Sequence, residues 1–198
     1  MKQRSRSKRS ISGFTLIEML VVIIVIGVLF AIAAPGWDTI LSRQRVSAGR
    51  EQIAQTIRIA QSEARRTRAP RIVVFDASTN GKPRVATAPY TTGTALPVNN
   101  ANITTWELLG NGNVNPNTLK LAIGGSSAAN RALVFDSNGT IAQVPTVPTA
   151  QSLPFFITVS RGNTTGTATN RCVVIDTLLA SIRTDEGAYN AGTGRGCQ

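Results

Sequence analysis

A single apolar run near the N-terminus limits what this 198-residue chain can become. From Met19 to Ala34 no charged or strongly polar side chain occurs, and the apolar character extends back to Phe14. Residues 14–34 are long enough for one membrane span at a rise of about 1.5 Å per residue. A basic leader precedes the run and contains Lys2, Arg4, Arg6, Lys8 and Arg9. A basic leader followed by an apolar run is the arrangement of a signal peptide or a membrane anchor whose basic end is cytoplasmic.

The residues at either end of the apolar run indicate whether it is retained. Downstream, AIAAPGW at 31–37 is the nearest approach to a small-x-small cleavage site, and a cut there would remove the run as in an ordinary secretory signal. Upstream, Gly13 stands directly before the run in SGFTLIE, which suggests that only the leader, residues 1–13, is removed. We therefore expect the run to be kept, with standard signal cleavage as the alternative.

Glu18 is a charged residue within this otherwise apolar region. A carboxylate at the centre of a bilayer helix costs about 2.5–3.5 kcal/mol on insertion scales. In one interpretation Glu18 lies at the level of the lipid headgroups, where it is solvated and has no particular role. In the other interpretation it has a cationic partner, because a buried charge requires one.

The composition argues against catalysis. The chain has no histidine, which excludes His-dependent triads, Cys–His dyads and imidazole metal sites within it. Its two cysteines are too few for a structural zinc site, and no GxxxxGK(S/T) phosphate loop occurs. Asp76, Asp136 and Asp176 each close a β-like run, which marks strand exits more readily than a carboxylate cluster. We predict a non-enzymatic protein with no catalytic residue, metal site or cofactor.

The charge balance is basic, with 21 Lys and Arg against 10 Asp and Glu and a formal net charge of +11. Part of this excess belongs to the leader, and the remainder of the chain is still moderately basic. Such a balance favours an acidic partner without demonstrating one.

Beyond the apolar run the pattern predicts further helix. Pro35 and Gly36 interrupt first, so a kink or local unwinding is expected there, at the end of a helical segment covering 14–37. Over residues 38–69 the apolar positions are spaced mostly by three, four and seven, which is typical of an amphipathic helix. These positions are Ile40, Leu41, Val46, Ile53, Ile57, Ala60 and Ala64. Pro70 discourages continuation, so the prediction is one long kinked helix.

Residues 70–198 have the pattern of a β-rich head. Short β-branched or aromatic runs alternate with turn sequences such as NGK and DSNG. The runs are RIVVFD, RVATA, TTWELL, LKLAI, RALVFD, TIAQV, FFITVS and RCVVID. Strands without intervening helices favour antiparallel sheets, so we predict an α+β fold in which the long helix packs on a β-sandwich-like head. FDSNGTIAQV reads as a hairpin around Asn138-Gly139, and 88–117 as a region with a long loop.

Two cysteines, Cys172 and Cys197, lie near the C-terminus. They could be two buried thiols. A chain with an export signal meets an oxidising compartment, however, and there a disulfide is favoured. Closing a loop of about 26 residues stabilises a protein by about 3 kcal/mol in the chain-entropy model. We predict this disulfide, which would hold the tail at residues 178–196.

The N-terminal pattern resembles that of type IV pilins and of the pseudopilins of type II secretion. The resemblance lies in GFTLIEMLVVIIVIGVLFAIAAP, with Gly13 before the cut, Phe14 as the new first residue, Glu18 as the fifth and Pro35 as the twenty-second. REQIAQTIRIAQSEARRTRAPRIVVF and ALVFDSNGTI are similar to the GspH/FimT branch of minor pilins. In that branch a long helix packs against a β-rich head.

The resemblance implies a maturation pathway and a partner for Glu18. A prepilin peptidase would cut between Gly13 and Phe14 and methylate the new amine of Phe14. Methylation keeps the amine charged, so Glu18 can neutralise the Phe14 amine of a neighbouring subunit in a filament core. The implied location is the bacterial inner membrane, single-pass with a periplasmic head, and then a pilus or pseudopilus. The implied partners are the peptidase and other pilin or pseudopilin subunits.

Two functions compete within this branch. One is a structural role as a minor pilin or pseudopilin, at a filament tip or in assembly initiation. The alternative is FimT-like DNA binding during DNA uptake through a C-terminal Gly-Arg-x-Arg motif. Here LLASIRTDEG has Ala180 and Ser181 in place of Gly-Arg and keeps only Arg183.

Further arginines are candidate nucleic-acid contacts. Arg171 and Arg195 could join Arg183 near the disulfide, although Asp185 and Glu186 would repel phosphate. A second cluster at the helix end contains Arg65, Arg66, Arg68 and Arg71. The sequence favours the structural role and does not separate a pilus from a secretion pseudopilus.

Overall fold

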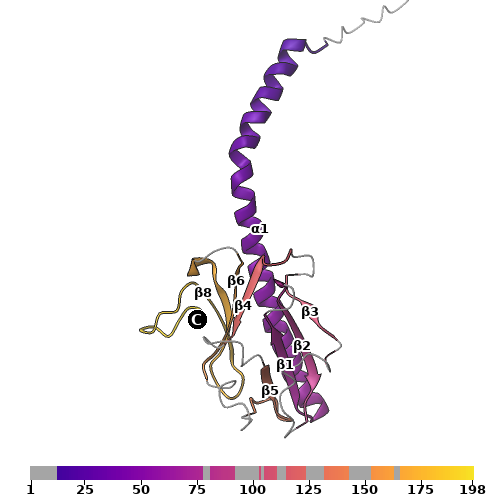
Figure 1. Ribbon diagram of the computed structural model, residues 1–198, viewed down its shortest axis with the longest axis vertical. Helices are drawn as coiled ribbons and strands as arrows, with labels where there is room; N and C mark the ends of the chain where they lie inside the picture. Colours follow the sequence, from indigo (N-terminus) through magenta and orange to yellow (C-terminus); the bar gives the residue numbers. More distant parts are fainter. Residues whose placement is uncertain are drawn as a thin grey trace, which may run out of the picture. The chain divides into compact units, whose positions relative to one another are not determined.

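The structure is a computed structural model (Figure 1). It describes residues 13–77, 81–91, 103, 105–110, 115–123, 132–142, 153–162 and 166–198, and side chains except those of 33–38. The chain divides into two compact units, Met1–Ile40 and Leu41–Gln198, each taken by itself below. Residues 1–12 of the predicted leader and most of the predicted loop at 88–117 lie outside the described residues.

The helix α1 spans Leu16–Thr67. Its start is capped by Thr15, whose backbone oxygen and Oγ1 accept the N–H of Glu18 at 3.1 and 3.3 Å. A threonine followed three residues later by glutamate is a typical helix N-terminus. α1 continues through Pro35 and Gly36, so the described backbone is helical there and not unwound. A kink at these residues stays a prediction.

Within the second unit, α1 buries one stripe of apolar side chains. Val46, Ile53, Ile57, Ala60 and Ala64 are at most 1% exposed, which confirms the predicted amphipathic pattern over this part. The stripe begins later than predicted, because Ile40 is 56% exposed. After Thr67 the chain leaves the helix through Arg68, which has a φ of +49°, and Pro70 follows. This is the expected end of a helix before proline.

The head contains two four-stranded antiparallel sheets, one in the order β3-β2-β1-β5 and the other in the order β4-β6-β7-β8. The first has β1 (Arg71–Asp76), β2 (Arg84–Pro89), β3 (Glu107–Leu108) and β5 (Ala132–Phe135). The second has β4 (Leu119–Ile123), β6 (Phe155–Arg161), β7 (Arg171–Ile175) and β8 (Ile182–Glu186). A short 3-10 helix, η3 (Thr167–Thr169), precedes β7. The predicted α+β class with antiparallel sheets is confirmed.

The strands differ from the prediction at two places. Of TIAQV (140–144), which was expected to be a strand, Ile141 forms an isolated bridge with Phe135, and residues 143–144 lie outside the described residues. β8 was not expected, because its polar sequence IRTDE lacks the alternation of a half-buried strand. It forms nevertheless because β7 offers a full edge, with Val173 paired to Thr184 and Arg171 to Glu186.

The main core lies where both sheets and the buried stripe of α1 meet, and Figure 1 shows the strands gathered around the C-terminal half of α1. Phe75, Phe135, Phe155 and Ile157 are among its fully buried residues. Gly49 of α1 faces this core, and a Cβ there would lie in ordinary van der Waals contact with Val159, at 3.4 Å. Two smaller apolar clusters add to this core. One includes Ile72, Val74 and Tyr90, and the other Phe156, Cys172, Val174 and Cys197.

Candidate functional site

The predicted cleavage point lies in exposed, non-helical chain. Gly13 and Phe14 precede the first helical residue, Leu16, and both are exposed. A Cβ added at Gly13 would meet nothing within 4 Å, and the Phe14 side chain is 73% exposed. Exposed non-helical backbone is where a peptidase reaches a peptide bond most readily. Cleavage after Gly13 and methylation of Phe14 stay predictions.

Glu18 occupies the first turn of α1 and is exposed. Among the residues described, its carboxylate forms no ion pair. This position stabilises the carboxylate without a cationic partner, because a negative charge near a helix N-terminus interacts favourably with the helix dipole. Its predicted partner, the Phe14 amine of a neighbouring subunit, belongs to another chain and stays a prediction.

The apolar residues that follow Glu18 have no cover from the described part of the chain. From Met19 to Ile32 the exposed fractions of the large apolar residues run from 45% at Val22 to 74% at Phe30. They occur all around the helix and not as a stripe. A helix of this kind is normally buried against other apolar material.

Within the described residues, no helix combines the length and mean hydropathy required of a membrane span.

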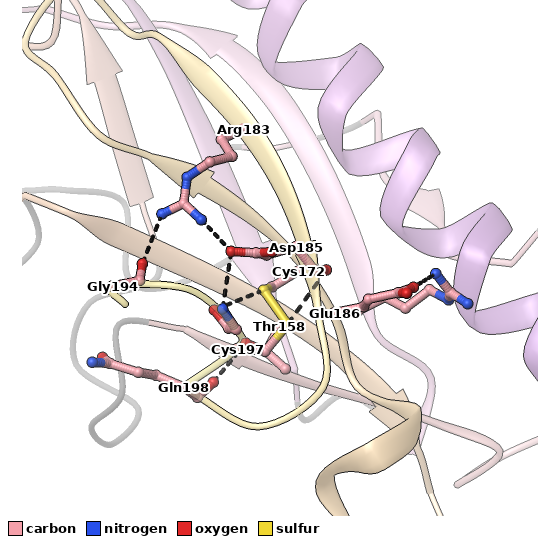
Figure 2. Close-up of a disulfide and its surroundings, with 10 residues drawn as sticks. Thr158, Cys172, Arg183, Asp185, Glu186, Gly194, Cys197 and Gln198 are labelled. Atoms are coloured by element: carbon pink, nitrogen blue, oxygen red, sulfur yellow. Dashed lines mark hydrogen bonds and ion pairs between the residues drawn. A yellow bond between two sulfur atoms is a disulfide. The ribbon is translucent and has the colours of Figure 1, made fainter. Parts of the chain in front are cut away.

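The predicted disulfide between Cys172 and Cys197 is present, with the two Cα atoms 5.6 Å apart (Figure 2). Both cysteines are buried, at 0% and 4% exposed. The bond ties the C-terminal tail to β7, and the tail is also held by hydrogen bonds. Thr158 Oγ1 donates to the Gln198 carbonyl at 2.5 Å, and the Gly196 N–H donates to Asp185 Oδ2 at 2.9 Å. The tail thereby helps cover the apolar cluster around Phe156.

Arg183 is fully engaged by groups of its own chain. Its guanidinium donates to the two carboxylate oxygens of Asp176 at 3.0 and 3.2 Å and to the Gly194 carbonyl at 3.2 Å. It also pairs with Asp185, as Figure 2 shows. The hydrogen bonds that Arg183 donates to Asp176 raise the pKa of Arg183; burial opposes this shift, and the charges of Asp176 and Asp185 add to it. This arginine holds β8 and the tail together.

The other two arginines of the predicted nucleic-acid site do not complete it. Arg171 pairs with Glu186, which lies directly opposite on β8. Arg195 is exposed on the tail and has no carboxylate partner among the described residues. Asp185 and Glu186 were interpreted as charges that repel phosphate, but they neutralise Arg183 and Arg171. Facing positions on β7 and β8 are the signal for the Arg171–Glu186 pair, whereas Arg183 and Asp185 are two residues apart on β8 and so share one face of the sheet.

The arginines at the end of α1 are divided between structural contacts and solvent. Arg65 Nε donates to the Asn138 carbonyl at 3.1 Å, and Arg71 lies 3.4 Å from Glu63. Arg66 and Arg68 are exposed, and neither forms an ion pair with a described carboxylate. The cluster therefore fastens the helix end to neighbouring turns more than it forms a separate site.

The three aspartates at strand ends do not form a cluster. Asp76 ends β1 and lies 2.9 Å from Arg84, and Asp176 follows β7 and binds Arg183. Asp136 follows β5 and accepts the N–H of Thr140 at 2.8 Å, its hydroxyl at 2.8 Å and the N–H of Asn138 at 2.9 Å. The interpretation as strand exits is confirmed. Among the described residues no three His, Cys, Asp or Glu side chains gather to hold a metal ion.

Residues 8–34 match the model of the prokaryotic N-terminal methylation motif. This match covers Gly13, Phe14 and Glu18, so the N-terminal segment of the chain carries that motif. The search of the curated proteins found no match to this sequence.

Two crystal structures of the type IV minor pilin FimU of Pseudomonas aeruginosa (strain PAO1) are similar to this chain. The form in space group P21 has 17% identity and a TM-score of 0.48, over 72% of this chain and 90% of FimU. The form in space group P65 has 16% identity and a TM-score of 0.43, over 70% of this chain and 90% of FimU. Identities this low carry no function from one chain to the other.

Proposed function

We propose that this protein is a minor type IV pilin or a pseudopilin, a structural subunit that acts at a filament tip or in assembly initiation. The observation that carries the proposal is the methylation motif at residues 8–34, with its exposed junction at Gly13–Phe14. The apolar residues from Leu16 to Ile32, exposed on all sides, support it because they suit a helix surrounded by lipid or by other subunits.

In this proposal the chain is first held in the inner membrane with its head in the periplasm. A prepilin peptidase removes residues 1–13 and methylates Phe14. Glu18 then pairs with the Phe14 amine of a neighbouring subunit, so that two charges enter the apolar filament core together. The proposal assigns the chain no catalytic role, no metal and no cofactor.

N-terminal mass spectrometry of protein from cells that express a prepilin peptidase tests the maturation step. The expected mature chain begins at methylated Phe14. A mature chain that begins after Ala33 or Ala34 would identify the run as an ordinary signal peptide and overturn the proposal.

Substitution of Glu18 tests the assembly step. Glu18→Ala should leave processing intact, because it removes a charge from the apolar segment, while incorporation into sheared filaments falls. Arg43→Ala, which removes an exposed charge from the same helix, serves as the matched control and should enter filaments as the wild type does. Equal incorporation of Glu18→Ala and wild type would refute the charge-pairing step.

DNA binding is the weaker candidate function. It would need a basic surface around Arg183, whereas Arg183 and Arg171 are engaged by three carboxylates.

A further inference from the structure

The turn between β7 and β8, residues 177–180, presents two leucine side chains to solvent. Leu178 is 48% exposed and Leu179 is 71% exposed. The backbone of this leucine turn is nevertheless tied down. The Leu178 carbonyl accepts the Ile141 N–H at 2.8 Å, the Leu179 carbonyl accepts Gln61 Nε2 at 3.2 Å, and the Ala180 N–H donates to Thr177 at 2.9 Å. Two adjacent apolar side chains on a fixed turn are suited to insertion into another surface.

A cationic side chain lies beside the leucine turn. Gln61, which binds the Leu179 carbonyl, also donates to the Gly139 carbonyl at 3.0 Å. Arg65, one helical turn further along α1, donates to the neighbouring Asn138 carbonyl at 3.1 Å. Arg65 is exposed, and the described carboxylates form no ion pair with it. The surface therefore combines an apolar anchor with one positive charge.

A hollow of opposite character lies against α1 and β3. It has a volume of about 460 Å³ and is lined by Ala48, Glu51, Gln52, Gln55, Thr56, Ile59 and Glu107. Ile59 is 46% exposed and gives the hollow an apolar wall. Glu107 has no ion pair among the described residues, and Glu51 lies 3.8 Å from an exposed Arg58. This carboxylate hollow would suit an apolar side chain accompanied by a cation.

The leucine turn and the carboxylate hollow lie on opposite sides of the helix. Gln52 lines the hollow and binds the Leu108 carbonyl of β3 at 3.1 Å, whereas Gln61 binds the leucine turn. Nine residues separate these two glutamines, which is a rotation of about 180° at 3.6 residues per turn. A contact between two such surfaces joins unlike faces, and unlike-face contacts propagate into rings or helical filaments.

We propose that the leucine turn of one copy of this chain docks in the carboxylate hollow of a second copy, with Arg65 facing Glu51 and Glu107. The contact rests on the proposed function, since it would join the head domain of one filament subunit to the head domain of the next. The leucines favour a protein partner, because a phosphodiester backbone offers no apolar pocket for them. The complementary charges fix which surface is chosen and in which orientation.

Cross-linking in whole cells tests this contact. Two differently tagged full-length copies are expressed together, one with Leu179→Cys and the other with Gln55→Cys, and are treated with a bismaleimide that reacts only with free thiols. A product that carries both tags is expected. Leu179→Cys on both copies is the matched control and should give no product, since the turn does not face its own counterpart.

Charge reversal then tests the orientation. Arg65→Glu or Glu107→Arg alone should reduce the cross-linked fraction by about threefold to tenfold, and the two together should restore it. Intact mass confirms the Cys172–Cys197 bond in each variant, so that misfolded protein is recognised.

The outcomes separate the two proposals. No two-tag product, a product only from the paired Leu179→Cys copies, or cross-linking only to another protein would each overturn the contact. The cells are cross-linked before fractionation, so the two-tag product can be detected whether or not the chain enters filaments. Its absence in filaments that contain the chain overturns the contact alone, and absence of the chain from every filament fraction counts against the proposed function.

Discussion

Residues 16–32 and residues 46–64 belong to one helix, yet their apolar side chains meet different surroundings. In the first stretch even the least exposed large side chain, Val22, is 45% exposed, whereas Ile53 and Ile57 in the second are fully buried. The second stretch confines its apolar residues to one stripe, and two sheets of the same chain cover that stripe. The first is apolar all round, and its large side chains are exposed in the described chain. One part of α1 therefore contributes to the core of the head, and the other does not.

The largest expected effect is the difference in the free energy of unfolding between a substitution in residues 46–64 and one in residues 16–32. Ile57→Ala should lower the free energy of unfolding of the head by about 2–5 kcal/mol, because it leaves a cavity in the core. Ile24→Ala, at a position that is 57% exposed, should change it by no more than about 0.5 kcal/mol. Chemical denaturation of the full chain in detergent measures both. Similar losses for the two variants would mean that residues 16–32 also stabilise the head.

Removal of the disulfide should cost the head about 3 kcal/mol and leave the first stretch of α1 unaffected. Cys172→Ser combined with Cys197→Ser frees the tail and uncovers the apolar cluster around Phe156. Denaturation of this variant should agree with denaturation of reduced wild-type protein. A loss below about 1 kcal/mol would show that the hydrogen bonds of Thr158 and Asp185 suffice to hold the tail.

A smaller, pH-dependent effect should come from Asp136, whose turn holds Gln61 and Arg65 of α1. Burial by itself would raise the pKa of Asp136, but hydrogen bonds from Thr140, Asn138 and Gly139 outweigh it and lower the pKa below 3.8. A lowered pKa stabilises the folded state above the unfolded value, and this contribution is lost as the pH falls through the folded pKa. Asp136→Asn should therefore destabilise the head by about 1 kcal/mol at pH 7.

The difference between wild type and Asp136→Asn should shrink as the pH falls below 3.8. Glu51→Gln, at an exposed carboxylate, is the control and should show no comparable dependence. Denaturation at several pH values measures both variants. A difference that persists at low pH would show that the Asp136 carboxylate is not what fixes the turn.

The smallest effect concerns DNA. Arg183→Ala should change the affinity for labelled duplex DNA by less than about twofold, because Asp176 and Asp185 already neutralise this arginine. Titrations at two salt concentrations should give a slope no steeper than about −3, as expected for few phosphate contacts. Arg195→Ala is the matched control at an exposed arginine. Submicromolar binding at physiological salt that is lost in Arg183→Ala would make DNA capture the leading function.

The sequence determined the features that depend on neighbours along the chain. The apolar run, the amphipathic spacing from Val46 to Ala64, the helix end near Pro70 and most strands follow from local patterns. Helix and strand periods are properties of a few consecutive residues, and so they can be read without the fold. The methylation motif at residues 8–34 is local in the same sense.

Only the tertiary structure decided the role of the charged residues near the C-terminus. Asp185 and Glu186 stood as repulsive charges beside Arg183 in the sequence. The register of β7 against β8 makes Glu186 the partner of Arg171, and the formation of β8 puts Asp185 on the same face as Arg183. β8 itself has little strand pattern and forms because the edge of β7 offers it hydrogen bonds. Charge pairing and edge pairing depend on which segments meet in space, and the order of residues does not state which segments meet.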